Sequence, residues 1–186
     1  MFKNLILIIV YIVMCSQSNA EIVFTDKFNQ KNDWYFITDQ VMGGISTGTY
    51  NYKKINNDDV VKITGNVSTK NNGGFIQVRR NLNNINLTNA KNVKVIAKGN
   101  NEKYFIHLRT NFTLLPWQYY QNSFTVKKDF KNFILPIRNF KKSGFLLPDK
   151  INPKNIKSIG IVAFGRDYKA ELIAVSYTHL TLPTSG

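Results

Sequence analysis

The stretch Tyr104-Phe-Ile-His-Leu-Arg-Thr110 decides the fold class, because its side chains alternate in character. In an extended strand Tyr104, Ile106 and Leu108 fall on one face, and the residues between them, including His107 and Arg109, fall on the other. Such alternation is typical of a β-strand that turns one face towards a hydrophobic core.

Similar short segments recur along the chain, separated by Gly, Asn, Asp or Pro, and no helical pattern of useful length interrupts them. Many short strands with turn signals between them predict an all-β sandwich. The expected strands cover residues 22–28, 47–55, 60–67, 74–79, 92–98, 104–110, 119–126, 132–137, 158–165 and 171–175.

The first 20 residues resemble a secretory signal peptide. Lys3 precedes an uncharged apolar run over residues 5–14, and small residues, Ser18 and Ala20, close the segment. We therefore expect residues 1–20 to direct the protein to the periplasm or outside a bacterial cell; an uncleaved anchor is the alternative. The single cysteine, Cys15, would leave with this segment, so the mature chain would have no disulfide and no thiolate metal site.

The last residues, 176–186, differ in composition from the rest of the chain. They contain no Lys and no Asn, both of which are abundant elsewhere. We expect this tail to be non-native and place the domain at residues 21–175. The alternative is a genuine C-terminal strand.

The net charge of +14 raises the question of a nucleic-acid partner, but only five of the 25 basic residues are arginine. Base and phosphate recognition favour arginine, and the lysines are scattered along the chain. The composition favours a solvated basic surface and no nucleic-acid partner. Weak contact with anionic envelope polymers or lipid headgroups, as in peripheral membrane contact, stays open.

Two glycine pairs mark special backbone positions. Gly43-Gly44 closes the segment Asp39-Gln-Val-Met-Gly-Gly-Ile-Ser46 and suits a tight turn or a close approach to a ligand. Asp39 beside it would cap the turn, bind a cation or face a ligand. Gly73-Gly74 opens a strand on which Phe75, Gln77 and Arg79 share a face, a mixture that suits a hydroxyl-rich or carboxylate ligand; a merely exposed sheet face is the alternative.

Aromatic residues gather in the loop over residues 111–120. Trp117 and Tyr119 offer flat surfaces that stack on sugar rings or anchor a protein interface. Trp34 is expected in the core. For His107 a structural role is favoured, because no HxH or HExxH spacing accompanies it.

Catalytic and cofactor motifs are missing from the sequence. The chain has 11 carboxylates without a recognisable acid–base pair, and no nucleophile elbow. We expect a protein that is not an enzyme, with no cofactor and no metal.

Several segments together resemble the complex I intermediate-associated protein 30 family. They are Trp34-Tyr-Phe-Ile-Thr-Asp-Gln-Val-Met-Gly-Gly-Ile-Ser46, Gly65 to Phe75 with Gln77 and Arg79, the Leu108-Arg109-Thr110 step, Trp117 with Tyr119 and Tyr120, and Gly165-Arg166. The resemblance implies a galactose-binding-domain-like jelly-roll sandwich. Mitochondrial members are assembly factors of respiratory complex I, whereas this chain carries an apparent export signal.

Two functions follow as hypotheses. The first, which the resemblance implies, is a non-catalytic assembly module that binds a protein partner of the cell envelope through Asp39, Met42, Arg109 and Trp117, beside Gly43 and Gly44. The second is a module that binds carbohydrate or envelope polymer. It would use a set of polar and aromatic side chains: Gln77, Arg79, Arg109, Trp117 and Tyr119.

Overall fold

The computed structural model describes residues 22–26, 28 and 33–181. The signal peptide expected at residues 1–20 and the last five residues of the expected tail lie outside this range. No helix of the described residues is long and apolar enough to cross a membrane.

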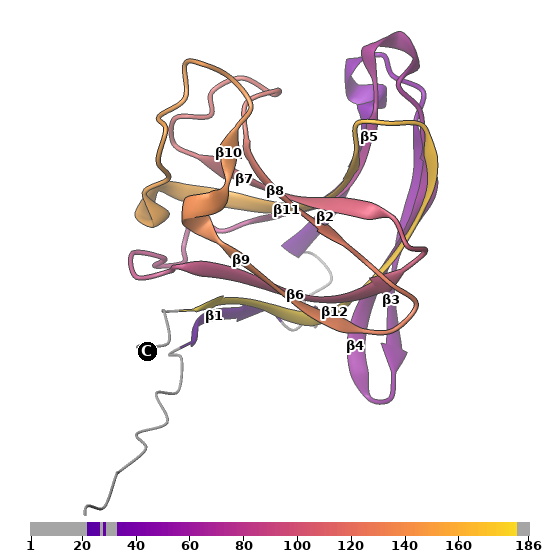
Figure 1. The fold of residues 1–186 in the computed structure, drawn as a ribbon, viewed down its shortest axis with the longest axis horizontal. Helices are drawn as coiled ribbons and strands as arrows, with labels where there is room; N and C mark the ends of the chain where they lie inside the picture. The colour runs from indigo at the N-terminus through magenta and orange to yellow at the C-terminus, as the bar shows by residue number, and fades with distance from the viewer. Residues whose placement is uncertain (1–21, 27, 29–32, 182–186) are drawn as a thin grey trace, which may run out of the picture.

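The chain folds into two antiparallel six-stranded sheets packed face to face (Figure 1). The first sheet has the order β3-β4-β12-β6-β9, and β1 also pairs with β12. Its strands are β1 (Ile22–Asp26), β3 (Thr47–Ile55), β4 (Asp58–Val67), β6 (Asn92–Gly99), β9 (Lys131–Pro136) and β12 (Tyr168–Thr181). The second sheet has the order β10-β8-β7-β11-β5-β2. Its strands are β2 (Trp34–Thr38), β5 (Phe75–Asn81), β7 (Lys103–Thr110), β8 (Tyr120–Thr125), β10 (Lys141–Lys142) and β11 (Ile156–Phe164).

The all-β prediction is confirmed, and every predicted strand overlaps an observed one. Strands β2 and β10 were not predicted, and they form the two edges of the second sheet. In β2 the side chains do not alternate between buried and exposed positions, and β10 has only two residues, so neither shows a period of two. Strand β12 continues to Thr181, beyond the boundary expected at residue 175. The domain boundaries themselves stay predictions.

The core lies between the two sheets and follows the alternation. On β7, Ile106 and Leu108 are fully buried, and Ile76 and Val78 of β5 face the same interior. Trp34 is buried as expected, with its ring 5.2 Å from that of Phe28. Burying each such side chain stabilises the fold by about 1.5–3 kcal/mol.

A buried carboxylate, Asp26, links β1 to strands β2 and β5 of the second sheet. Asp26 is buried, accepts a hydrogen bond from Trp34 Nε1 at 2.6 Å and pairs with the guanidinium of Arg80. Arg80 also reaches Asp33 at 2.6 Å, so its charge is matched on both sides.

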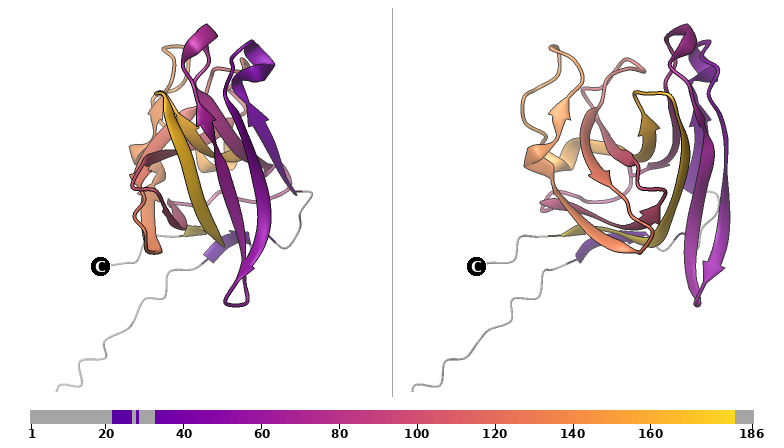
Figure 2. Two further views of the ribbon diagram at one scale, coloured as in Figure 1. Left: turned by 90° about the vertical axis from the view of Figure 1, so that its right-hand side faces the viewer. Right: turned by 45° about the vertical axis from the view of Figure 1, so that its right-hand side comes forward.

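Asp39 holds together two of the connections by which the chain crosses between the sheets. One connection, residues 39–46, contains the 3-10 turn η2 (Asp39–Met42) and joins β2 to β3; the other contains η3 (Lys70–Asn72) and joins β4 to β5. Figure 2 shows both turns at the same end of the molecule. The Asp39 carboxylate is fully buried, and the backbone N–H groups of Ser46, Gly74 and Phe75 donate to it at 2.9, 2.5 and 3.2 Å. The Ser46 hydroxyl donates as well.

One glycine of each pair packs directly against this carboxylate. A Cβ atom on Gly44 would lie 2.3 Å from Asp39 Cγ, and one on Gly73 would lie 2.5 Å from Asp39 Oδ2. Gly43 and Gly74 take the positive φ values 86° and 127°, which glycine adopts at little cost. Side chains larger than hydrogen would push the two connections apart.

The environment of Asp39 favours its charged form. Burial alone would raise the pKa of its carboxyl, but the hydrogen bonds from Gly74, Ser46 and Phe75 outweigh burial and hold the pKa below its usual value of 3.8. The stabilisation is therefore fully present above pH 4 and is lost as the pH falls through the lowered pKa of the folded state.

We predict that Asp39→Ala lowers the free energy of unfolding by about 3 kcal/mol, because three buried N–H groups lose their acceptor. Urea denaturation at pH 7 measures this change. The matched control is Asp167→Asn, which alters an exposed carboxylate that accepts from Thr69 N at 2.6 Å; its effect on the free energy of unfolding should be much smaller than that of Asp39→Ala. Equal losses in the two variants would show that Asp39 is no special anchor.

Candidate binding cleft

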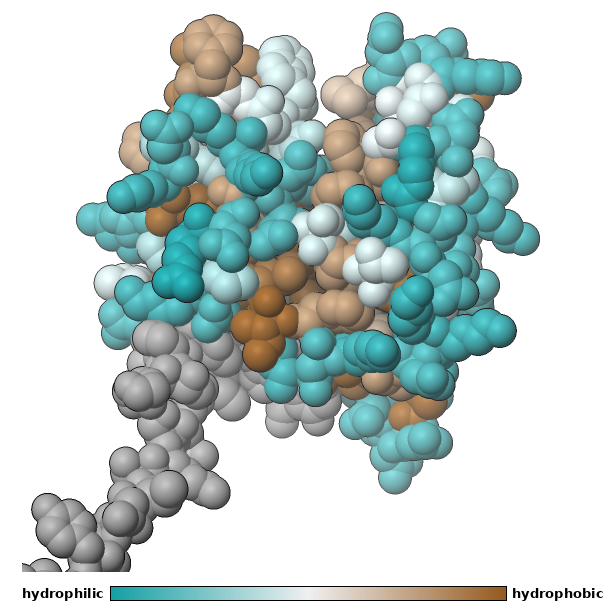
Figure 3. Space-filling view, in the orientation of Figure 1, coloured by the Kyte–Doolittle hydropathy of each residue, from teal (hydrophilic) through white to brown (hydrophobic). Residues whose placement is uncertain are grey.

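A cleft of about 420 Å³ opens on the outer face of the second sheet. In the space-filling view it lies in the notch between the two upper lobes of the molecule (Figure 3). Strands β2, β5, β11 and β7 form its floor, and the loop before β8 closes one side. Its lining residues are Tyr35, Ile37, Val41, Met42, Asn72, Gly73, Phe75, Gln77, Arg79, His107, Arg109, Pro116, Trp117, Tyr119, Val162 and Phe164.

Strand register sets the order of the side chains across the floor. Tyr35 of β2 lies opposite Arg79 of β5, Arg79 lies opposite Gly160 of β11, and Gly160 lies opposite His107 of β7. Gly160 leaves the middle of this row without a side chain. A Cβ atom there would lie 3.0 Å from Gln77 Oε1, so the glycine keeps the floor open beside Gln77.

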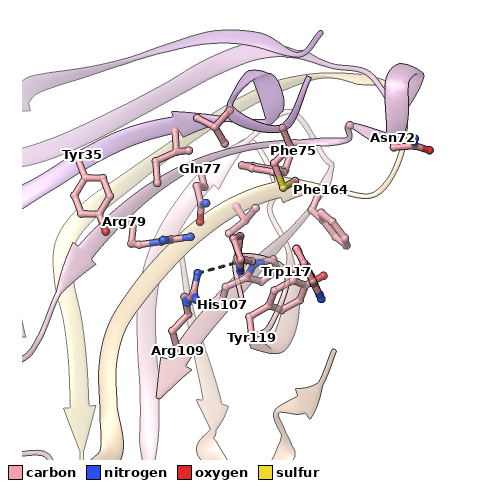
Figure 4. A pocket seen from close by; sticks show the side chains of 16 residues that line it. Tyr35, Asn72, Phe75, Gln77, Arg79, His107, Arg109, Trp117, Tyr119 and Phe164 are labelled. Atoms are coloured by element: carbon pink, nitrogen blue, oxygen red, sulfur yellow. Dashed lines mark hydrogen bonds between the residues drawn. The ribbon is translucent and has the colours of Figure 1, made fainter. Parts of the chain in front are cut away.

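An aromatic wall borders the floor (Figure 4). The ring of Tyr119 stacks on that of His107, with centroids 3.9 Å apart and planes 7° from parallel. Phe164 meets His107 edge-on, with centroids 5.5 Å apart. Trp117 stands at the rim with 61% of its surface exposed. The cleft thus offers flat apolar surfaces to a ligand.

Two buried polar atoms in the cleft have no hydrogen-bond partner. Gln77 is 4% exposed and His107 is 8% exposed, yet Gln77 Oε1 and His107 Nε2 make no hydrogen bond. Leaving a buried polar atom unpaired costs about 1–3 kcal/mol, and such atoms are rare in native proteins. Gln77 and His107 both line the cleft, whereas the other two such atoms among the described residues, Arg80 Nε and Gln121 Oε1, belong to residues that do not line it.

Arg109 organises the aromatic loop. Its guanidinium donates to the carbonyl oxygens of Thr113 and Leu115 at 3.0 Å and of Pro116 at 3.3 Å; the last bond is drawn in Figure 4. Because these three hydrogen bonds hold the segment just before Trp117, Arg109 positions Trp117 at the rim of the cleft.

The structure brings together most of the predicted site residues and separates the rest. Those that line the cleft are Met42, Gln77, Arg79, Arg109, Trp117 and Tyr119. Asp39 is buried beneath the adjoining turn, and its oxygens are occupied by the backbone, so its role is to position η2. Gly43 and Gly44 shape the same turn and do not line the cleft.

Sequence reasoning missed Tyr35 and Phe164, and it assigned His107 a structural role. Alternation places Phe164 on the face of its strand that the cleft uses, but nothing local indicates that this strand lies between β5 and β7. For His107 the signal was its position two residues before Arg109, on the same face.

His107 is held neutral. Burial, followed by the positive charge of Arg79, lowers the pKa of its imidazole to about 3. A neutral imidazole presents one donor and one acceptor nitrogen, which suits a hydroxyl group. Among the described residues no group of three His, Cys, Asp or Glu side chains is placed to hold a metal ion.

The two packed antiparallel sheets, with a cleft on the outer face of one of them, define a jelly-roll β-sandwich. The chain belongs to the complex I intermediate-associated protein 30 family, whose model matches residues 22–172. No curated protein matches the sequence.

Solved structures confirm the jelly-roll fold. The family 11 carbohydrate-binding module of the cellulosomal cellulase Lic26A-Cel5E of Clostridium thermocellum superposes with a TM-score of 0.69 and 11% identity, covering 89% of this chain and 96% of that one. The Clostridium thermocellum module in complex with a β-1,3-1,4-mixed-linked tetrasaccharide gives the same TM-score and identity, with 89% and 98% covered. A family 30 carbohydrate-binding module gives a TM-score of 0.55 and 10% identity, with 90% of each chain covered.

We predict that His107 makes the protein less stable as the pH falls below about 6.5. The unfolded chain binds a proton there and the folded chain does not, so stability rises with pH in this window. Two pH units of such linkage amount to about 2–3 kcal/mol. Denaturation of the parent and of His107→Gln at pH 7.5 and 4.5 measures the difference. The variant should lose less stability on acidification, and an equal loss would show that His107 titrates normally.

Proposed function

We propose that the cleft binds an oligosaccharide and that the protein is a non-catalytic binding module. The observation that carries this proposal is the pairing of exposed aromatic rings with buried, unpartnered polar atoms at Gln77 and His107. The volume of the cleft, about 420 Å³, falls within the range of roughly 300–1,000 Å³ that small-ligand sites occupy.

A sugar ring matches this combination of groups. Its C–H faces stack on aromatic rings, here Tyr119 and Trp117, while its hydroxyl groups both donate and accept hydrogen bonds. Gln77 Oε1 would accept a hydroxyl proton, and the neutral imidazole of His107 would exchange one hydrogen bond with a hydroxyl through Nε2. An entirely apolar ligand would leave both atoms unpaired.

The relatives in fold support the proposal by analogy. The similar solved structures are carbohydrate-binding modules, and one of them is described in complex with a tetrasaccharide. Identity near 11% carries the fold and not the ligand, so the side chains of this cleft have to carry the argument.

Binding without catalysis is the second part of the proposal. Hydrolysis of a glycosidic bond ordinarily needs two carboxyl groups across the scissile bond. None of the described residues that line the cleft is an Asp or a Glu. The groups present would hold a sugar chain and would not cleave it.

We predict that Trp117→Ala and Gln77→Leu each weaken binding of an oligosaccharide about tenfold or more, because one removes a stacking surface and the other a hydroxyl acceptor. Affinity electrophoresis against a panel of neutral and acidic polysaccharides identifies a retained polymer, and calorimetry with its oligomers measures the loss. The control is Phe130→Ala, an exposed ring that packs on Lys98 away from the cleft. Retention of no polymer in the panel would contradict the proposal.

A second candidate function, binding of a protein partner, rests on exposed apolar loop tips at the same end of the fold. Leu114 is 82% exposed in the loop before β8, and Phe145 is 86% exposed in the loop after β10. The two loops are joined, since Ser143 Oγ donates to the carbonyl oxygen of Trp117 at 2.9 Å. Exposed apolar clusters of this kind mark interaction sites. An assembly role in the manner of the family would use this surface; if residues 1–20 export the chain, only the outer face of the membrane arm of complex I is accessible.

For this candidate we predict that Leu114→Ser combined with Phe145→Ser abolishes co-purification with subunits of complex I from detergent-solubilised membranes, while glycan retention persists. Mass spectrometry of the captured subunits gives the readout. Capture of the same subunits by the double variant, or no capture by the parent, would contradict an assembly role through these loops.

A further inference from the structure

The cleft contains two arginines and no acidic side chain. Arg79 on β5 and Arg109 on β7 both line it, on either side of β11. None of the described lining residues is an Asp or a Glu, so the cleft itself supplies no counter-charge. With His107 neutral, the two guanidinium groups give the cleft a positive charge.

Two other arginines of the described chain, Arg80 and Arg166, have acidic partners. Arg80 pairs with Asp26 and Asp33, and Arg166 pairs with Glu102. In these pairs a carboxylate neutralises the charge of the arginine. The chain has only 11 carboxylates beside 25 basic residues, so such pairing is available to few of them.

Arg79 has no such partner. It makes no hydrogen bond and no ion pair with any described residue, although it is only partly exposed and lies one residue from the doubly paired Arg80. Its guanidinium carries five N–H donors, all of them free to bind a ligand in the cleft (Figure 4).

Arg109 is held in place but its charge is not neutralised. Three of its five donors go to the carbonyl oxygens of the aromatic loop, and carbonyl groups carry no net charge. Burial and then the nearby charge of Arg79 lower the pKa of Arg109. Two like charges that repel each other in a partly buried cleft are stabilised by an anion placed between them.

We propose that the ligand is an acidic oligosaccharide, one whose sugar residues carry a carboxylate or a sulfate group, and that Arg79 and Arg109 bind the acidic group. This inference rests on the proposed glycan-binding function and specifies its ligand class. Guanidinium groups form forked, charge-assisted hydrogen bonds with such oxyanions. The same sugar unit would stack on Tyr119 and offer its hydroxyl groups to Gln77 and His107.

Calorimetry on the full chain tests the inference with three sets of matched oligomers. These are oligogalacturonates, the same oligomers after reduction of their carboxyl groups to alcohols, and sulfated galactan oligomers. We expect at least one acidic set to bind about tenfold or more tightly than the reduced set, because a charge-assisted hydrogen bond contributes about that much to affinity. The affinity of the acidic set should fall as the salt concentration is raised. Whichever acidic set binds more tightly identifies the acid.

The key variant is Arg79→Gln, because Arg79 supports no other part of the structure. It should remove the preference for the acidic oligomers and their salt dependence. The matched control is Arg138→Gln, an exposed arginine in η4 (Ile137–Asn139) that does not line the cleft; the preference should persist.

The outcomes separate this inference from the proposal beneath it. Equal binding of the reduced and acidic oligomers would overturn the acidic ligand and leave glycan binding standing. A preference for acid that survives Arg79→Gln would also overturn it, since the charge would then act elsewhere on the basic surface. Binding of no oligomer in any set would overturn glycan binding itself.

Discussion

One buried carboxylate links the architecture to the cleft. Asp39 accepts hydrogen bonds from two of the connections that carry the chain between the sheets, and these two connections also supply Met42, Asn72 and Gly73 to the rim of the cleft. A carboxylate gathers several N–H groups at once, which a neutral acceptor of the same size does less well. The position of one wall of the cleft therefore depends on an interaction that no ligand touches.

Much of the fold and part of the cleft could be predicted from the sequence, because a period of two is a local property. Alternation alone placed Gln77 with Arg79, and His107 with Arg109, on the faces they occupy. The order of the strands is not local. That β11 separates β5 from β7, bringing Phe164 beside His107, depends on pairings between distant segments, and no nearby residue encodes them.

The two glycine pairs are a second case in which contacts between distant segments cannot be predicted from the local sequence. From the sequence, each pair marks a special backbone position of its own, a tight turn or ligand approach at Gly43-Gly44 and the start of a strand at Gly73-Gly74, since glycine permits positive φ. The reason for two pairs is shared, because Gly44 and Gly73 both make room for the side chain of Asp39 from segments about 30 residues apart. A sequence shows that a backbone position is special, whereas the atom that makes it special can lie on another strand.

Membership of a family and likeness of fold leave the ligand open, so the energetics of the cleft must decide between functions. Gln77 Oε1 and His107 Nε2 are buried without partners at a cost to the unliganded protein, and Arg79 lacks a counter-charge in the same cleft. Apolar residues at these positions would remove the cost without disturbing the core on the opposite face of the sheet. The proposed acidic oligosaccharide would satisfy these three groups together, because it carries hydroxyl groups and negative charge on the same molecule.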